Sequence, residues 1–230
     1  SEVQKALYKS YADTAREELT SLVKKEGFEK VHIHVLATLT RLKQICCHPA
    51  IFAKEKAEEG DSAKYEMLME LLQSLIEGQH KTVIFSQYTK MLNILRQDLE
   101  KLGVKFAYLD GTTKNRLDVV NTFNEDPSLS VFLVSLKAGG SGLNIIGADT
   151  VIHYDMWWNP AVENQATDRV HRIGQENPVS AYKLVTLGTI EEKILELQNR
   201  KKELIKNVIY NDDDVISKLT WDEVLELLQT

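Results

Sequence analysis

The stretch KTVIFSQYTKMLNILRQDLEKLGVKFAYLDG, residues 81–111, decides the fold. It starts with an apolar, β-branched run at 82–86, continues through leucines at helical spacing, and returns to an apolar run at 104–109. An apolar run without polar alternation is typical of a strand covered on both faces. Strand, helix and strand in this order form a right-handed crossover, which predicts a parallel sheet.

Three further apolar runs, at 130–135, 150–154 and 179–186, extend this pattern. Between the second and third strands, a helical pattern around Val119 and Phe123 follows an Asp-Gly turn. Alternation of strands and helices predicts an α/β protein, with a parallel sheet flanked by helices.

Both ends of the chain are predicted to be helical. Apolar residues from Val3 to Leu22 and from Leu36 to Ile45 keep helical spacing. Near the other end, Thr189 and Glu192 form a capping box in which Glu192 is expected to reach the Thr189 amide. We expect a helical segment over 1–60, the α/β lobe over 61–186 and C-terminal bracing helices over 187–230.

Composition and charge exclude several classes of protein. The 230 residues are 43% hydrophobic and 27% charged, as in a soluble globular protein, and no apolar run is long enough to span a membrane. The net charge of −6 argues against a dedicated nucleic-acid clamp, although one local basic face would suffice for a DNA motor.

The cysteines are Cys46 and Cys47, which are adjacent and offer no disulfide framework. This favours a reducing compartment. No second ligand pair at zinc spacing accompanies them, so we expect buried packing and no metal site.

The segment NPAVENQATDRVHRIGQ, residues 159–175, carries the most informative polar pattern. It opens with Asn159 and Pro160, which are typical of a helix start. On the helix predicted after them, Gln165, Arg169 and Arg172 fall at i, i+4 and i+7 and would share one solvent-facing stripe. Two guanidinium groups beside an amide suit phosphate oxygens. The alternative is a solvated face whose arginines pair with nearby carboxylates.

Two other segments suggest ligand contacts. SLKAGGSGLNI, residues 135–145, follows a predicted strand, and its glycines would let backbone amides approach phosphates beside Lys137. The alternative is a plain tight turn. YDMWWNP, residues 154–160, carries two tryptophans that either pack in the core or interface, or present a flat ring to DNA.

Taken together, these strings resemble the C-terminal half of the Swi/Snf family of superfamily-two ATPases, in family order and over nearly the whole chain. The matching strings are LTRLKQICCHP (39–49), VIFSQYTKML (83–92), YLDGTTKNRLDVVNTFN (108–124), VFLVSLKAGGSGLNI (131–145), QATDRVHRIGQ (165–175) and GTIEEKILELQNRKKEL (188–204). The chain departs from the family after the Asp-Gly pair, where Thr112, Thr113 and Lys114 replace the usual Ser and Pro.

The resemblance implies the second RecA-like lobe of a double-stranded-DNA translocase that binds ATP and Mg²⁺ between two lobes. The phosphate-binding loop and the acidic Mg²⁺ motif belong to the first lobe and do not occur in these 230 residues, so the isolated chain is expected to be inactive. Arg169 and Arg172 match the family's arginine fingers. The implied nucleotide-side residues are Gln165, Gly140, Ser141 and Gly142, and the implied DNA-side residues are Ser86, Gln87, Gly111, Thr112, Lys137 and Trp158.

The expected partners are double-stranded DNA, the N-terminal RecA-like lobe of the same polypeptide and nucleoprotein substrates, with no membrane. The expected location is the nucleoid in a prokaryote or the nucleus in a eukaryote. One alternative is a strand-separating helicase lobe of another branch, against which the RIGQ and WNP strings argue. Another is a catalytically silent α/β interaction module, against which the arginine stripe argues.

Overall fold

The computed structural model describes residues 1–53, 61–137, 142–171, 173–201, 214 and 216–230. The candidate residues Gly140, Ser141 and Arg172 lie outside the described residues. The chain divides into two compact units. The sheet unit comprises Met67–Met156 and Val162–Leu184, and the helical unit comprises Ser1–Glu66, Trp157–Ala161 and Val185–Thr230.

The sheet unit is built on a parallel sheet which, in the described part of the chain, has five strands in the order β2-β3-β1-β4-β5. The strands are β1 (Thr82–Ser86), β2 (Phe106–Leu109), β3 (Val131–Ser135), β4 (Thr150–His153) and β5 (Ser180–Lys183). In register, Thr82 faces both Val131 and Thr150. Each strand falls within a run predicted from the sequence, and the predicted α/β class is confirmed.

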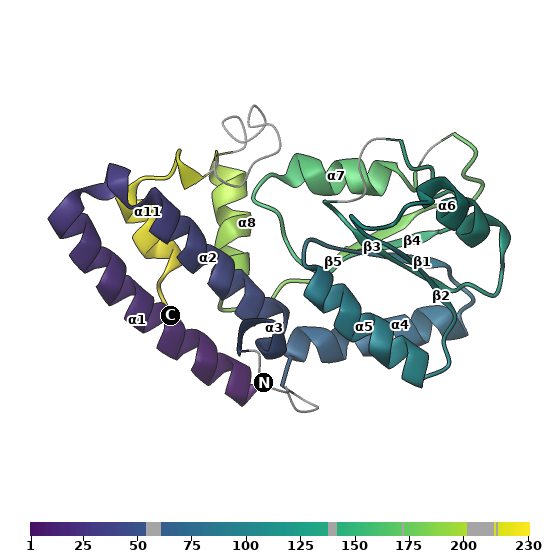
Figure 1. The fold of residues 1–230 in the computed structure, drawn as a ribbon, viewed down its shortest axis with the longest axis horizontal. Helices are drawn as coiled ribbons and strands as arrows, with labels where there is room; N and C mark the ends of the chain where they lie inside the picture. Colours follow the sequence, from purple (N-terminus) through teal and green to yellow (C-terminus); the bar gives the residue numbers. More distant parts are fainter. Residues whose placement is uncertain (54–60, 138–141, 172, 202–213, 215) are drawn as a thin grey trace. The chain divides into compact units, whose positions relative to one another are not determined.

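Helices cover both faces of this sheet. They are α4 (Ala63–Glu77, whose first residues belong to the helical unit), α5 (Thr89–Lys101), α6 (Arg116–Glu125) and α7 (Pro160–Asp168). The first two lie on one face and the last two on the other (Figure 1). This alternation follows from right-handed crossovers that leave β1 in one direction and β2 and β4 in the other.

Burial within the sheet unit differs from the prediction at its periphery. The central strands β1, β3 and β4 are buried throughout, but every residue of the edge strand β5 is exposed. The prediction that every strand is covered by other elements on both faces is therefore wrong for β5. Along α5, the helically spaced leucines Leu92, Leu95 and Leu99 are buried as predicted. Leu102, the next leucine, is 64% exposed because the helix has already ended at Lys101.

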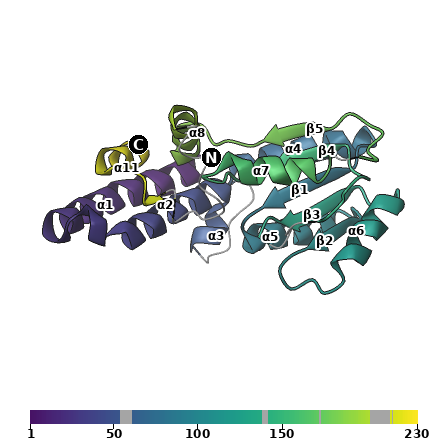
Figure 2. The same cartoon turned by 90° about the horizontal axis from the view of Figure 1, so that it is seen from above.

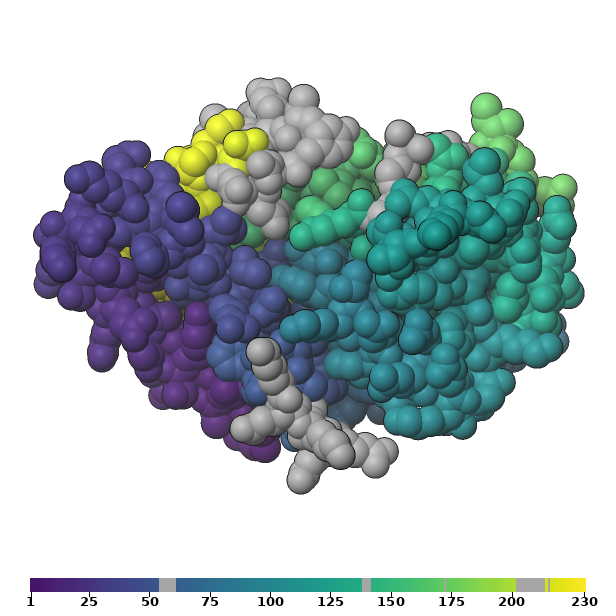
Figure 3. Space-filling view, in the orientation of Figure 1, coloured from purple at the N-terminus to yellow at the C-terminus, as the bar shows by residue number. Residues whose placement is uncertain are grey.

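The helical unit brings the two ends of the chain into one core. It contains α1 (Glu2–Glu26), a 3₁₀ turn η1 (Phe28–Lys30), α2 (His32–Cys47), α3 (Pro49–Ala53), α8 (Ile190–Arg200) and α11 (Trp221–Leu227). The helices α1 and α2 lie side by side (Figure 2), and their side chains form one continuous surface in Figure 3.

The buried face of α1 agrees with the prediction in its second half, at Ala15 and Leu19, but is shifted by one residue in its first half. Val3 is 60% exposed, whereas Gln4 is buried and donates from Nε2 to the Ile45 carbonyl at 2.8 Å. The buried stripe consists of Gln4, Tyr8, Ala12, Ala15 and Leu19. The predicted stripe was chosen by apolar character alone. Gln4 and Tyr8 can be buried because each forms a hydrogen bond with a backbone group.

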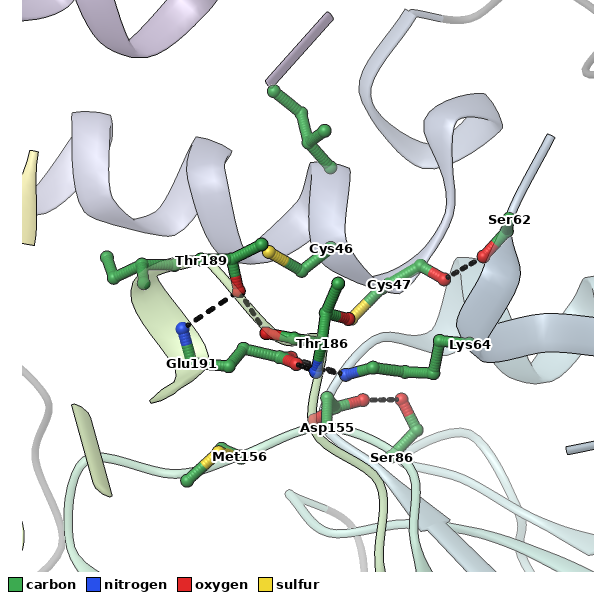
Figure 4. Close-up of polar contacts among 12 residues, drawn as sticks. Cys46, Cys47, Ser62, Lys64, Ser86, Asp155, Met156, Thr186, Thr189 and Glu191 are labelled. Atoms are coloured by element: carbon green, nitrogen blue, oxygen red, sulfur yellow. Dashed lines mark hydrogen bonds and ion pairs between the residues drawn. The ribbon is translucent and has the colours of Figure 1, made fainter. Parts of the chain in front are cut away.

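A buried ion pair links the segments of the helical unit (Figure 4). Lys64 donates to both carboxylate oxygens of Glu191, and the two side chains are 2% and 1% exposed. Burial is the largest single effect and lowers the pKa of Lys64, but the Glu191 carboxylate together with the nearby Cys47 and Cys46 raises it overall. The same carboxylate accepts from the Thr186 amide at 2.8 Å, so the buried charge is paired and hydrogen-bonded.

The start of α8 departs from the expected capping box. Thr189 caps the helix by accepting from the Glu191 amide at 3.3 Å. Glu192 accepts from the Gly188 amide at 2.8 Å, rather than from the Thr189 amide as predicted. In addition, the Ile190 amide donates to the Tyr8 hydroxyl at 2.7 Å, and this bond connects α8 to α1.

Candidate functional site

The parallel topology gathers four loops at one edge of the sheet. The loops after β1, β2, β3 and β4 all leave from carboxyl ends of strands, which is where ligands bind in open α/β sheets. Five of the six predicted DNA-side residues, Ser86, Gln87, Gly111, Thr112 and Lys137, end a strand or follow one at this edge. Two of these five residues are buried and three are exposed, which separates residues that shape a turn from residues that face solvent.

The turn after β1 is held internally by Asp155. Ser86 donates to one oxygen of this buried carboxylate (Figure 4). The Gln87 amide donates to the other oxygen at 3.1 Å. The Gln87 side chain donates to the Met156 carbonyl at 2.9 Å. Ser86 and Gln87, which the resemblance places on the DNA side, are both buried, so their side chains shape the turn. Asp155 was missed in the sequence; its signal was a carboxylate directly after an apolar strand.

The turn after β2 is exposed. Thr112 donates its hydroxyl to Asp110 Oδ1 at 2.7 Å, and its amide donates to the same oxygen at 2.8 Å. The Thr112 hydroxyl bond is the main cause that lowers the pKa of Asp110, so this carboxylate stays charged. Gly111 is exposed, with open space where a Cβ would stand. Gly111 and Thr112 thus present backbone and a short polar group to solvent.

The turn after β3 presents one cation. Lys137 is exposed directly after β3. Gly142, also exposed, adopts φ +111°, a conformation that L residues rarely reach. Lys137 and Gly142 flank the glycine-rich segment, whose inner candidates are outside the described residues.

Trp158 belongs to the helical unit and is 1% exposed. The Lys43 ammonium lies 5.6 Å from its ring centroid, and Gln198 donates to the carbonyls of Trp157 and Trp158 at 2.8 and 3.0 Å. Core packing, the alternative kept open for this tryptophan pair, is therefore what the structure shows. The expectation of an outward-facing Trp158 ring is corrected, because the ring fills the core of the helical unit.

Helix α7 begins as predicted and ends early. Asn159 caps it by accepting from the Ala161 amide at 2.9 Å. The helix stops at Asp168, so Gln165 lies on the helix but Arg169 lies in the following turn, its amide donating to Ala166 at 3.2 Å. The predicted single stripe of three residues on one helix is thus wrong for Arg169, which is half-buried rather than fully solvent-facing.

Polar contacts fix α7 on the sheet. His153 Nε2 lies 2.8 Å from the Thr167 hydroxyl, and Lys183 pairs with the buried Glu163 at 2.5 Å. The Arg169 carbonyl accepts from the Ile145 amide at 3.0 Å. The backbone carrying Arg169 is therefore held by β4, β5 and the segment before β4, while Gln165 remains exposed.

The expectations of buried cysteines and of no zinc site concern the helical unit. Cys46 and Cys47 are buried free thiols, and burial raises the pKa of Cys46 to about 12. Within the described ranges, no three His, Cys, Asp or Glu side chains gather at metal-binding distance. In the same ranges, no helix is long and apolar enough to cross a membrane.

Comparison with known sequences agrees with this geometry. The family described as "Helicase conserved C-terminal domain" matches residues 63–174. YwqA of Bacillus subtilis (strain 168) is 40% identical over 229 residues, which cover 97% of this chain and 24% of YwqA. Helicase SWR1 of Yarrowia lipolytica is 41% identical over 182 residues, or 76% of this chain and 10% of SWR1. The chain thus spans a quarter or less of these curated relatives.

Solved structures are similar to this chain over nearly its whole length. The C-terminal domain of the Sulfolobus solfataricus SWI2/SNF2 ATPase is 32% identical, with a TM-score of 0.77, and the match covers 97% of this chain and 92% of that domain. The ATPase core of the same organism in complex with dsDNA gives 34% identity and a TM-score of 0.82, covering 97% of this chain and 47% of that one. Sheet, helices and motif order define a RecA-like lobe of the helicase type. This chain belongs to the SWI2/SNF2 ATPase family and corresponds to the C-terminal lobe of such ATPases.

Proposed function

We propose that this chain is the second motor lobe of an ATP-dependent translocase that moves along double-stranded DNA. Arg169 and Arg172 would act as arginine fingers beside Gln165, and the loops at the carboxyl edge of the sheet would hold the DNA backbone. Family membership supports the general role, since its relatives include a helicase and an ATPase core solved with dsDNA. The protein would act in the nucleoid or the nucleus, on nucleoprotein substrates.

The nucleotide would lie between this lobe and an N-terminal lobe of the same polypeptide. That partner would bind most of ATP and its Mg²⁺, which supplies charge neutralisation at the phosphates. On this lobe, two groups suit the phosphates of ATP: the positively charged guanidinium of Arg169 and the exposed amide of Gln165. Arginine fingers stabilise the charge that develops on the transferred phosphoryl group, an effect of about 10³–10⁵ in rate on other NTPases. The observation that carries the proposal is Arg169, whose backbone is fixed while part of its surface stays accessible.

Phosphate contacts on DNA position a motor without reading sequence. The exposed residues Gly111, Thr112 and Lys137 suit such contacts, because they offer backbone, a hydroxyl and one positive charge. Ser86 and Gln87 would act indirectly, by shaping the turn after β1.

The test uses the full-length protein with duplex DNA and saturating ATP. Arg169→Ala should lower DNA-stimulated ATP turnover by about 10³-fold or more and change the affinity for ATP little. Arg16→Ala is the matched control, an exposed arginine on α1. The 230-residue chain alone should hydrolyse no ATP. Near-parental turnover in Arg169→Ala would overturn the assignment of this finger.

A further inference from the structure

Gln175, the last residue of the segment 159–175, binds the stretch that directly follows the glycine-rich segment 135–145. Its side-chain nitrogen donates to the Ala148 carbonyl at 2.6 Å and to the Ile146 carbonyl at 3.0 Å, with the Val170 carbonyl at 3.4 Å. A side-chain amide has two hydrogens, so the two short bonds use its donor capacity. Its oxygen accepts from the Asn177 amide at 3.1 Å, so both ends of the side-chain amide bind backbone groups.

The same segment is held from its other side by α6. Asn124 donates to the Asn144 carbonyl at 2.9 Å and accepts from the Gly147 amide at 2.8 Å. A Cβ at Gly147 would stand 2.6 Å from the Asn124 Cα, so only glycine permits this approach. Residues 144–148 therefore form a fixed strip between Asn124 and Gln175.

This strip meets the turn that carries Arg169. The Ile145 amide, inside the strip, donates to the Arg169 carbonyl at 3.0 Å. Ile145 is fully buried and so offers this bond a fixed, water-free setting. The carbonyl of the next residue, Val170, faces Gln175 itself. The Arg169 carbonyl is thus bound by the strip, and the next carbonyl along the chain lies 3.4 Å from the Gln175 side-chain nitrogen.

We propose that Gln175 is a positioning residue for Arg169, acting through the strip 144–148. The inference rests on the proposed role of Arg169 as an arginine finger. A guanidinium stabilises developing charge only if it is held close to the productive geometry, and a misplacement of ~1 Å can cost ~10²-fold in rate. Gln175 supplies this restraint without touching the nucleotide.

A polar depression of about 410 Å³ beside Gln175 offers another role, ligand binding. Asn124 and Gln175 form part of its wall, but their amides already bind backbone groups. Their contacts therefore favour positioning over recognition of a ligand.

The experiment compares four variants of the full-length protein: Gln175→Met, Arg169→Ala, the double variant, and Glu176→Gln as an exposed control on the same depression. Gln175→Met keeps the length of the side chain but removes both donors. We expect its kcat to fall by roughly 10- to 100-fold, with the KM for ATP within about twofold of the parent. Glu176→Gln should match the parent.

Non-additivity separates positioning from general damage. If Gln175 acts through Arg169, the double variant should be no slower than Arg169→Ala alone. Parental kcat in Gln175→Met, or a double variant slowed by the product of the two single effects, would overturn the inference. Full activity in Arg169→Ala would instead overturn the proposed function. Should Gln175→Met fail to fold, Gln175→Asn, whose amide is one methylene too short, carries the same comparison.

Discussion

His153 is a buried imidazole at the end of β4. It stacks on Phe85 with ring centroids 5.6 Å apart, and its Nε2 contacts the Thr167 hydroxyl. Burial, reinforced by the positive charge of Lys183, lowers the pKa of His153 from 6.5 to about 4. Phe85 and Thr167 carry no charge that would stabilise an imidazolium. The ring is therefore neutral in the folded protein at neutral pH.

This shift predicts an acid-sensitive contribution to stability. Below about pH 6.5 the unfolded chain binds a proton at this residue, whereas the folded chain does not until about pH 4. Stability from the neutral ring is thus present above pH 6.5 and is lost as the pH falls to 4, by up to ~3 kcal/mol. Urea denaturation across this range should show a shallower acid loss for His153→Gln than for the parent. Parallel curves would contradict the prediction, and His171→Gln, at an exposed site, should behave as the parent.

At the scale of single residues, the sequence indicates chemical type better than environment. Ser86 and Trp158 were recognised as parts of motifs, yet both are buried. Their partners are Asp155 for Ser86, and Lys43 for Trp158. The first pair is 69 residues apart, and no local pattern records such a pairing. Burial of polar groups depends on those distant partners, so it could not be predicted.

Among the structural elements, the packing of α6 against the segment before β4 depends on Gly147. Its hypothetical Cβ would meet the Asn124 main chain at 2.6 Å, and a backbone atom cannot move aside as a flexible side chain can. Gly147→Ala should therefore lower the free energy of unfolding by about 1–3 kcal/mol.

Gly111→Ala is the matched control for this substitution. Gly111 has no atom within 4 Å of a built Cβ, so its substitution should change stability by no more than about 0.5 kcal/mol. Urea denaturation of both variants measures the difference. Equal stabilities would contradict the prediction and show that the segment around Gly147 can shift without loss of stability.

Element boundaries show where periodicity stops being informative. The pattern NQATDRVHRIGQ contains no glycine or proline before Gly174, so the sequence predicts a helix that continues past Asp168. In the structure α7 ends at Asp168, and the Arg169 carbonyl accepts from the Ile145 amide. Strand β5 is likewise found where predicted, but its exposure reflects its edge position, which only the strand order reveals.

For the whole molecule, the net charge of −6 limits affinity for DNA. Lys137 is the cation that the loop after β3 offers at the carboxyl edge among the described residues. Lys137→Ala in the full-length protein should weaken binding to all duplex sequences alike and make the slope of log K against log salt shallower by about one.

A salt titration checks this prediction, with Lys105→Ala as the control. Lys105 is also exposed but precedes β2, at the opposite edge of the sheet. An unchanged slope for Lys137→Ala, or an equal change for Lys105→Ala, would remove the carboxyl edge as the path of the DNA.

The pairing of Lys64 with Glu191 has a consequence in time. The two residues are 127 positions apart. At a translation rate of about 5–20 residues per second, roughly 6–25 s pass between the emergence of one partner and that of the other from the ribosome. Throughout this interval the residues of α1 and α2 are present without those of α8, so the side of α2 that packs against α8 lacks this partner. The helical unit must therefore close after synthesis of the sheet unit, although it contains the first residues of the chain.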